Sequence, residues 1–443
     1  MEFRDLNLSD ALLNALDEQG YVNPTTIQHK VFPVVMSGRD VCGIAQTGTG
    51  KTLAYLLPIL RQWEFARDKS PKVLIIVPTR ELVMQVVETA KKLSTYITVN
   101  IAGVYGGTNI KTQMLSVAGG VDILVATPGR LVDMIMNGTI SLKLIKRLVI
   151  DEVDEVLSIG FSYQLTSILN LLPAKRQNLL FSATITPEVE KIIQSYFNNP
   201  QKIEAAPTGT PLANIIQTGY ELPNFYTKVN LLKLLLAQPE FTKVLVFAVT
   251  KKLADELFEQ IDAAFPEQIG VIHSNKSQNF RFDVVKKFQN GTHRVLIATD
   301  IIARGLDVAE VSHVINFDTP DEPENYMHRI GRTGRADRKG IAITFIIPKE
   351  NENREAIEEL MNCKIPIESL PVALEISELL TADEMPKVYM PNIHERFKLK
   401  EDTGAFHEKL EKNKKVNAPV SRGERLKAKY GKPKTRGQKK KGK

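Results

Sequence analysis

The feature that most restricts the fold of this chain is a pattern of apolar segments that occurs twice, in the same order and with nearly the same spacing. The corresponding segments are KVLIIVPTREL at Lys72 and KVLVFAVTKKL at Lys243, GVYGG at Gly103 and GVIHS at Gly270, and DILVATPGR at Asp122 and RVLIATDIIAR at Arg294. Their offsets stay between 167 and 172 residues. One such match could be chance, because apolar strands resemble one another, but three in order favour a duplicated fold.

Short runs rich in Val, Ile and Leu alternate with longer helical patterns in both halves. These runs lie at 73–77, 123–125 and 148–150, and again at 244–247, 295–297 and 314–317. Continuous apolar runs are typical of parallel strands that are buried on both faces and joined by helices. A chain of 443 residues is also too long for one compact core. The sequence therefore predicts an α/β fold with two tandem parallel-sheet domains.

The domain boundaries are predicted from composition. AAPTGTPLANI, at 205–215, contains two prolines, a glycine and several small residues, which is typical of a linker. We predict an N-terminal domain at 1–205, a linker at 206–214, a C-terminal domain at 215–370 and a C-terminal extension at 371–443.

Positive charge is concentrated in the C-terminal tail. Residues 391–443 contain 18 Lys and Arg against 6 Asp and Glu, so their net charge of +12 leaves −5 for residues 1–390 of a chain with +7 overall. From about residue 401 we expect a disordered, Lys-rich arm that attracts phosphate without sequence preference. A tail that only improves solubility is the alternative.

Other features of the composition indicate a cytoplasmic protein. No basic and apolar leader is present, and no apolar run reaches membrane-spanning length. The two cysteines, Cys42 and Cys363, have no pairing or metal-ligand spacing, and we expect both to be buried thiols in a reducing compartment.

AQTGTGKT follows an apolar strand at 40–44 and precedes a helical stretch, as a phosphate-binding loop requires. Glycines let backbone N–H groups surround phosphate oxygens at a helix N-terminus. We expect Lys51 to reach the β- and γ-phosphates and the Thr52 hydroxyl to bind Mg²⁺. A Gly-rich turn without ligand is the alternative. The predicted ATP-binding residues are Ala45, Gln46, Thr47, Gly48, Thr49, Gly50, Lys51 and Thr52.

Asp151 and Glu152 end another apolar strand, at the carboxyl edge where parallel sheets bind ligands. Asp151 is predicted to hold the metal, and Glu152 to orient and deprotonate the attacking water. Two acids after a strand are more often solvated or cap a helix, but a phosphate loop in the same chain favours catalysis. Arg332 and Arg335 lie in the second half and are expected to neutralise charge on the γ-phosphate; a solvated basic turn is the alternative.

With these pieces assembled, the chain resembles the DEAD-box RNA helicases, of the bacterial type, over about 3–347. The motifs that carry the resemblance are Gly20-Tyr21, Pro24 to Gln28, AQTGTGKT, Pro78 to Leu82 (PTREL), Gly106-Gly107, Thr127 to Arg130 (TPGR), Asp151 to Asp154 (DEVD), Ser182 to Thr184 (SAT), Leu245 to Thr250, Gln278 to Arg281, Ala298 to Asp300, Arg304 to Asp307 and His328 to Arg335 (HRIGRTGR). The resemblance implies two RecA-like domains forming a superfamily-2 helicase core, with ATP and Mg²⁺ as cofactors and RNA as partner.

The family's roles in binding the nucleotide and in coupling ATP to RNA are assigned only to residues that match its motifs. Gln28 would read the adenine edge, since its amide can donate and accept; an ordinary side chain at a helix start is the alternative. The other ATP-binding positions implied by the resemblance are Phe3, Tyr21, Thr26, Gly305 and Asp307. The residues implied to couple ATP to RNA are Asp154, Ser182, Thr184 and His328.

The resemblance also implies an RNA-binding face that contacts mainly phosphate and sugar, with little base information. The matching residues are Thr79, Arg80, Gly107, Thr127, Gly129 and Arg130 in the first half and Thr250, Gln278, Arg281, Thr299 and Arg304 in the second. Turn residues at strand ends are the alternative for single members. Val153 and Val83 depart from the alanines usual in the family, and the added bulk is expected to affect rate or coupling rather than activity itself.

The predicted function is RNA-stimulated ATP hydrolysis coupled to domain closure and local, largely sequence-independent unwinding or remodelling of RNA. An ATP-gated RNA clamp or assembly scaffold uses the same residues and is the first alternative. A translocating DNA helicase or remodeller is the second, against which the Gln28 segment and SAT argue. We expect the protein to be a monomer that associates with ribonucleoprotein or RNA-decay complexes and does not bind a membrane.

Overall fold

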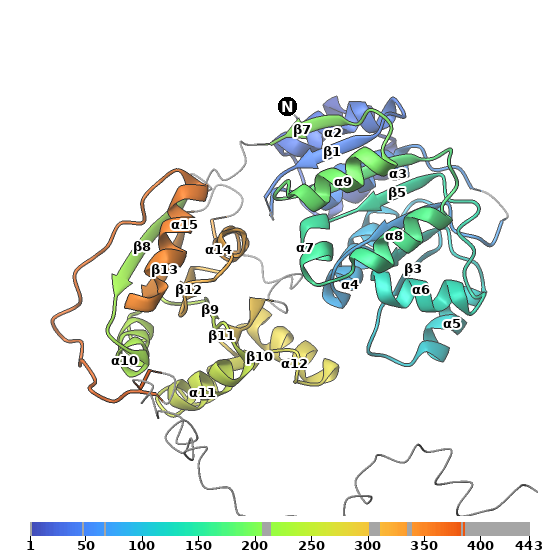
Figure 1. The fold of residues 1–443 in the computed structure, drawn as a ribbon. Helices are drawn as coiled ribbons and strands as arrows, with labels where there is room; N and C mark the ends of the chain where they lie inside the picture. The colour runs from blue at the N-terminus through green and yellow to red at the C-terminus, as the bar shows by residue number, and fades with distance from the viewer. Residues whose placement is uncertain are drawn as a thin grey trace, which may run out of the picture. The chain divides into compact units, whose positions relative to one another are not determined.

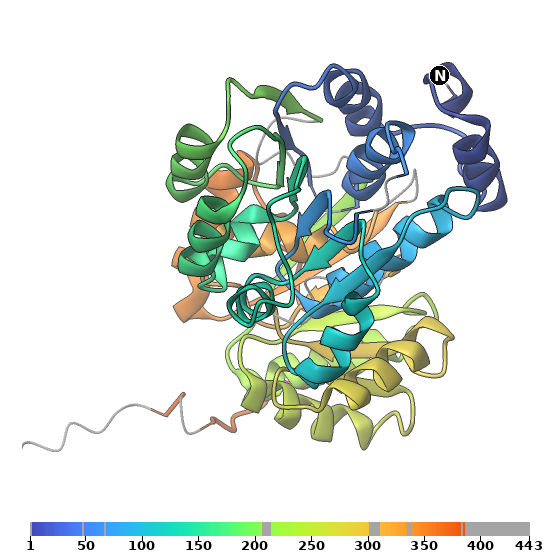
Figure 2. The same cartoon turned by 90° about the vertical axis from the view of Figure 1, so that its right-hand side faces the viewer.

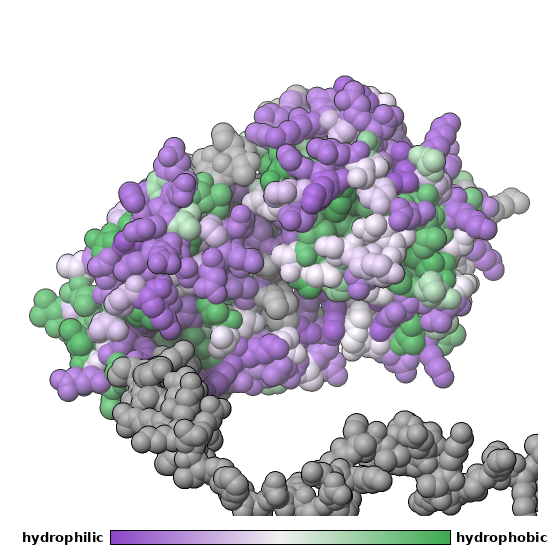
Figure 3. Space-filling model, viewed as in Figure 1, coloured by the Kyte–Doolittle hydropathy of each residue, from purple (hydrophilic) through white to green (hydrophobic). Residues whose placement is uncertain are grey.

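The computed structural model describes residues 2–46, 48–65, 68–205, 214–300, 311–334, 339–381 and 384–385. The linker predicted at 206–214 and the Lys-rich arm therefore fall outside the described residues, except Asn214. Among the described helices, none is long and apolar enough to cross a membrane. Hydrophilic residues prevail on the face drawn in Figure 3.

The first domain contains a parallel sheet of seven strands in the order β3-β4-β2-β5-β6-β1-β7 (Figure 1). The strands are β1 (Val41–Ile44), β2 (Val73–Ile76), β3 (Ile101–Val104), β4 (Ile123–Ala126), β5 (Arg147–Ile150), β6 (Gln177–Ser182) and β7 (Gln201–Glu204). The helical segments are η1 (Phe3–Asp5), α1 (Asp10–Glu18), α2 (Thr26–Met36), α3 (Lys51–Arg61), α4 (Arg80–Leu93), α5 (Ile110–Ala118), α6 (Pro128–Met136), α7 (Val153–Ser158), α8 (Ser162–Leu171) and α9 (Pro187–Tyr196).

Alternate residues of these strands face two separate cores. Val73 and Ile75 of β2 pack with α1 to α4, whereas Leu74 and Ile76 pack with α6 to α9. Both faces are therefore covered by helices (Figure 2), and all four β2 side chains are buried. This double burial explains the uninterrupted apolar runs in the sequence.

The second domain repeats this architecture with six parallel strands in the order β10-β11-β9-β12-β13-β8. The strands are β8 (Ile215–Glu221), β9 (Val244–Phe247), β10 (Ile269–Ile272), β11 (Val295–Ala298), β12 (His313–Asn316) and β13 (Gly340–Ile346). The helical segments are α10 (Phe225–Leu236), α11 (Lys251–Asp262), α12 (Gln278–Gln289), α14 (Pro323–Ile330), η2 (Pro348–Glu350) and α15 (Asn351–Met361). Numbered within each domain, both sheets follow the order 3-4-2-5-6-1, so the predicted fold class is confirmed.

The chain after α15 continues along the second domain. The Gly219 N–H donates to Pro366 O at 2.7 Å, and the Glu368 N–H donates back to Gly219 O at 2.9 Å. Further on, the Phe225 N–H at the start of α10 donates to Glu384 Oε1 at 2.7 Å. A carboxylate at a helix N-terminus is stabilised by the unpaired N–H groups there, so this segment is anchored at both ends.

The two cysteines differ in their surroundings. Cys42 in β1 is buried, and burial raises the pKa of its thiol to about 11. Cys363 is exposed, so the expectation of two buried thiols is wrong for this residue. It follows the end of α15, where the chain turns through Asn362 (φ 50°) towards the surface.

Candidate functional site

The phosphate loop joins β1 to α3 at the carboxyl edge of the first sheet. Gly48 and Gly50 have φ of 84° and 87°, a backbone region that favours glycine, and Gly50 caps α3. Lys51 begins the helix with 6% exposure, and its ammonium has no hydrogen-bond partner among the described residues. A buried cation without a partner is costly, and a phosphate at this N-terminus would satisfy it. Thr47 is not among the described residues.

The start of α2 is held against this loop. The Gln28 carbonyl accepts from the Thr25 N–H at 2.9 Å, and the Gln28 amide donates to Gly50 O at 3.0 Å. The Thr25 hydroxyl adds a bond to Thr49 O at 2.7 Å. Gln28 therefore contacts the phosphate loop, and its predicted role of reading adenine would require it to exchange these bonds.

The remaining adenine-side positions differ in burial. Phe3 is 3% exposed and packs in the core of the first domain, where its N–H donates to Val22 O at 3.1 Å. Tyr21 is 42% exposed, and Thr26 is the first residue of α2. Gly305 and Asp307 lie in the stretch 301–310, which the structure does not describe.

The acidic pair lies where β5 ends. Asp151 and Glu152 are 2% and 8% exposed, and the Asp151 carboxylate accepts from the Glu152 N–H at 3.0 Å. Glu152 has φ 50° and ψ 51°, a left-handed conformation that is strained for a residue with a side chain and is common at functional sites. Burial raises the pKa of Asp151, the nearby Lys51 charge lowers it and the Glu152 charge raises it, which together bring it to about 6. The two carboxylates and Lys51 thus form one charged group at the carboxyl edge.

Asp154 connects three of the predicted coupling positions. Its Oδ2 accepts from the Ala183 N–H at 3.1 Å and from the Thr184 N–H and hydroxyl at 3.0 Å each. His328 Nε2, from α14 of the second domain, lies 3.9 Å from the same oxygen. Burial alone would raise the pKa of Asp154, but His328, Lys51 and the Thr184 N–H outweigh it, so the pKa is lowered. Ser182, the fourth coupling residue, is fully buried at the end of β6.

Two further residues belong to this region and were missed by sequence reasoning. Glu155 is 3% exposed and forms an ion pair with His328 Nδ1. Its position directly after DEVD was the available signal. Arg329 is 1% exposed and binds Asp300 with Nε and Nη2 at 2.6 and 2.7 Å, which fixes HRIGRTGR to the end of β11.

The predicted arginine pair is described only in part. Arg332 is 5% exposed and follows α14, close in sequence to the His328 contact. Arg335 belongs to the stretch 335–338, about which the structure gives no description.

Eight predicted RNA-binding residues line one groove of about 580 Å³ between the two domains. They are Thr79, Arg80, Gly107, Thr127, Gly129, Arg130, Gln278 and Arg281. Thr250 lines a different pocket, at the carboxyl edge of the second sheet, and Thr299 is buried after β11. Arg304 is outside the described ranges.

The groove is crossed by a polar network around Glu81. The Glu81 carboxylate pairs with Arg281 at 3.1 Å and accepts from the Gln278 amide at 3.1 Å. Arg80 donates to the Gln278 carbonyl, also at 3.1 Å. Glu81 was not predicted as a site residue, although it lies within PTREL. A Cβ on Gly107 would lie 2.0 Å from Arg80 Nη1 and would displace that guanidinium, and the φ of 77° itself favours glycine here.

Comparison with known proteins places these motifs in a family. The DEAD/DEAH box helicase model matches residues 25–192, and the helicase conserved C-terminal domain model matches 227–337. The chain is 40% identical over 367 residues to "ATP-dependent RNA helicase CshA" of Limosilactobacillus reuteri, covering 82% of this chain and 73% of that protein. It is 38% identical over 363 residues to "DEAD-box ATP-dependent RNA helicase CshA" of Geobacillus kaustophilus, with 82% and 77% covered.

The fold also resembles that of a solved structure. Dbp5 of S. cerevisiae bound to RNA and ADP BeF3 superposes with a TM-score of 0.76 at 28% identity, covering 84% of this chain and 95% of that one.

Proposed function

Because this chain belongs to the DEAD/DEAH box helicase family, we propose that it is an RNA-dependent ATPase that uses ATP to close its two domains on RNA and separate short duplexes locally. The observation that carries this proposal is the buried Lys51 ammonium, which has no hydrogen-bond partner among the described residues and shares its site with Asp151. A cation and a carboxylate at a helix N-terminus fit a nucleotide phosphate with its metal ion.

The same residues fit Mg²⁺. Asp151 is buried with a raised pKa, so a divalent cation beside it would offset the cost of its charge. No group of three or more His, Cys, Asp or Glu that could hold a metal occurs in the described part of the chain, as expected for an ion that takes few protein ligands and several phosphate and water oxygens. Thr52 and Asp151 would hold it, and it would supply charge neutralisation between phosphate groups.

Each remaining residue has a task in hydrolysis. Glu152 has one buried carboxylate oxygen without a hydrogen bond to any described residue, and it would orient and deprotonate the attacking water. Arg332 and Arg335 would neutralise charge that develops on the γ-phosphate. Because the water-activating group comes from the first domain and the arginines from the second, hydrolysis would depend on closure. Asp154 and His328 connect the domains and would transmit closure to the ATP site.

RNA is the substrate that suits the groove. Its lining of hydroxyls, glycines and arginines fits phosphate and sugar oxygens and offers little to distinguish bases, so binding would be largely independent of sequence. Glu81 now holds Gln278 and Arg281, so RNA phosphates would compete with a carboxylate for them. We further propose that the protein acts as a monomer on ribonucleoprotein or RNA-decay complexes in the cytoplasm.

The test is ATP hydrolysis by the purified chain with and without RNA. Hydrolysis should rise with added RNA; an equal rate without RNA would contradict the coupling. Glu152→Gln should abolish turnover while ATP binding is preserved, because the amide keeps the shape but cannot take a proton. Glu188→Gln, an exposed position on α9, is the matched control and should hydrolyse ATP normally.

A further inference from the structure

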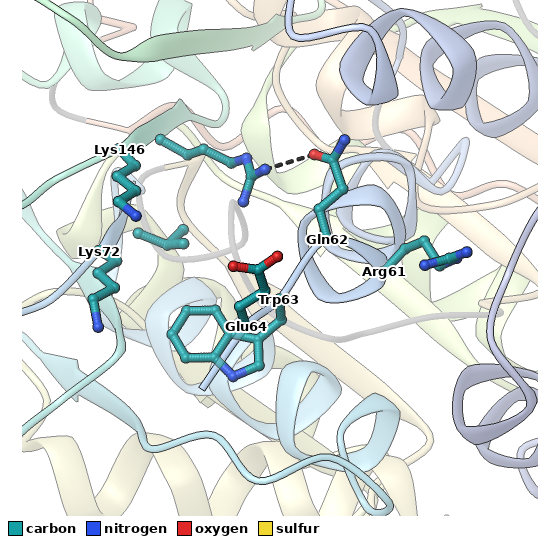
Figure 4. Close-up of a pocket in the computed structure, with 8 residues that line it drawn as sticks. Arg61, Gln62, Trp63, Glu64, Lys72 and Lys146 are labelled. Carbon is teal, nitrogen blue, oxygen red and sulfur yellow. Dashed lines mark hydrogen bonds between the residues drawn. The ribbon is translucent and has the colours of Figure 1, made fainter. Parts of the chain in front are cut away.

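A second polar pocket lies at the opposite edge of the first sheet, where β2 and β5 begin and α3 ends. It has a volume of about 590 Å³, within the range of small-molecule sites. Its lining residues are Arg61, Gln62, Trp63, Glu64, Lys72, Val73, Lys146 and Arg147 (Figure 4). None of them has a task in the ATP or RNA sites, which lie at the carboxyl ends of the strands.

The positive charge of Arg147 has no carboxylate partner among the described residues. Its guanidinium donates to two neutral amides, Gln62 Oε1 at 2.5 Å and Gln177 Oε1 at 3.3 Å. Among the described residues, no carboxylate oxygen lies within 4.0 Å of it, and burial lowers its pKa although Glu64 partly opposes this. A partly buried guanidinium usually has an anionic partner, since its remaining donors otherwise stay unmatched.

Two lysines strengthen the positive field of the pocket. Lys72 is 7% exposed, and its ammonium has no hydrogen bond in the described structure; its nearest carboxylate, on the exposed Asp68, is 3.6 Å away. Lys146 is exposed and lies on the same side as Lys72 (Figure 4), and its ammonium makes no hydrogen bond or ion pair with described residues, although its backbone pairs with Lys72 and Gln177. The Lys72 ammonium is enclosed, so it acts through its field, whereas Lys146 and Arg147 can reach a ligand.

The other charged groups do not cancel this field. Arg61 points away from the two lysines (Figure 4) and donates to Asn7 O at 2.7 Å. Glu64 is the one carboxylate among the lining residues that the structure describes. With Asp68 included, two carboxylates face three cations that Lys72, Lys146 and Arg147 provide, which leaves the pocket attractive to an anion.

Trp63 adds a flat apolar wall. Its indole N–H donates to Thr98 O at 3.1 Å, which holds the ring in place. A fixed aromatic ring beside two accessible cations suits a ligand that has both a planar ring and phosphate oxygens. An acidic peptide would satisfy the cations but make no use of the ring.

We propose that this pocket binds a nucleotide phosphate, either of a free nucleotide or of an RNA strand. The site is separate from the phosphate loop and would remain if the proposed ATPase activity were absent. Bound there, a nucleotide would bridge the end of α3 and the starts of β2 and β5, so its binding would stabilise the first domain.

Trp63 is the single tryptophan of the chain, so its fluorescence reports on this pocket. The full chain with Lys51→Ala, which weakens phosphate binding at the loop, is titrated with AMP, with pyrophosphate and with a short oligouridylate. A saturable change in emission is expected, and its midpoint gives the affinity. Lys146→Ala should lower this affinity roughly ten-fold through loss of one charge-assisted contact, and Arg147→Gln should lower it at least as much.

Lys143→Ala removes an exposed charge four positions from Arg147 and is the matched control, with affinity unchanged. A response to AMP identifies a free nucleotide as ligand, and a response to the oligonucleotide alone identifies RNA. No response to any probe, or a response to pyrophosphate alone, overturns the proposal. So does an affinity that neither Lys146→Ala nor Arg147→Gln changes, or that Lys143→Ala lowers equally. If Arg147→Gln fails to fold, the result for Lys146→Ala decides the test, because Lys146 is exposed and its replacement should not affect folding.

Discussion

Replacing Asp151 with asparagine should abolish ATP hydrolysis and at the same time stabilise the protein in the absence of ligands. Asp151 is 2% exposed, and burial raises its pKa from 3.8 to about 6. Keeping this carboxyl ionised at neutral pH therefore costs free energy of folding, which a neutral side chain of the same shape would recover. Such a cost is typical of sites that are arranged for a ligand.

The magnitude follows from the two pKa values. A carboxyl whose folded-state pKa is raised contributes full stability below its unfolded value of 3.8 and loses it as pH rises through about 6. Above pH 7 the loss amounts to about 3 kcal/mol as an upper estimate. Asp151→Asn should therefore raise the melting temperature by up to roughly 5–10 °C at pH 7.5. The gain should shrink as pH falls towards 4, where wild-type Asp151 is itself protonated.

The assay is thermal unfolding with EDTA and without nucleotide, at pH 7.5 and pH 4.5. Asp154→Asn is the control, because its carboxylate accepts three bonds from Ala183 and Thr184 and its pKa is lowered. That variant should be less stable than wild type above the unfolded pKa of 3.8 and should lose this difference as pH falls. Equal melting of wild type and Asp151→Asn at pH 7.5, or a difference that does not change with pH, would refute the reasoning.

Three more outcomes follow from the site. Gly107→Ala should raise the RNA concentration for half-maximal ATPase activity, because the added Cβ would lie 2.0 Å from Arg80; hydrolysis without RNA should be unaffected, and unchanged RNA dependence would contradict it. Gln28→Ala removes the bond to Gly50 O and should lower the preference for ATP over GTP, measured as the ratio of kcat/KM values. Deleting residues 391–443, which carry a net charge of +12, should weaken RNA affinity and flatten its salt dependence; an unchanged slope would exclude an electrostatic tether.

The architecture and the ATP side of the site were predictable because their signals are local. Apolar runs identify strands buried on both faces, and a phosphate loop needs only its glycines, Lys51 and the helix that follows. The alanine-to-valine departures concern packing, and both Val83 and Val153 are fully buried. Val83 Cγ1 would lie 2.7 Å from a Cβ on Gly103, so the absent side chain of Gly103 makes room for it.

The missed residues depend on contacts between distant parts of the chain. The sequence could not indicate the role of Glu81 because its partner Arg281 is 200 positions away. It could not indicate that of Glu384 because this residue caps a helix that begins at Phe225. No periodicity or spacing reports such pairs. Cys363 was misjudged for a related reason, since cysteine is usually buried but here follows a helix end at the surface.

The duplicated fold also explains why one domain, and not both, is suited to bind ATP. Because the sheets share one strand order, β8 corresponds to β1 and β12 to β5, so Lys228 of α10 and Asp318 after β12 occupy positions related to those of Lys51 and Asp151. Lys228 is 1% exposed and donates to Asp318 at 3.2 Å and to Glu350 at 3.0 Å.

The second domain therefore neutralises its lysine within the fold, and an ion pair so enclosed has nothing to gain from a phosphate. In the first domain, Lys51 has no such hydrogen bond among the described residues, and Asp151 has a raised pKa. The carboxyl edge of the second sheet thus holds a structural ion pair, whereas that of the first holds two buried charges, Lys51 and Asp151, that a bound phosphate and metal ion would stabilise. This difference is the physical basis for expecting one nucleotide at the carboxyl edges of the two sheets.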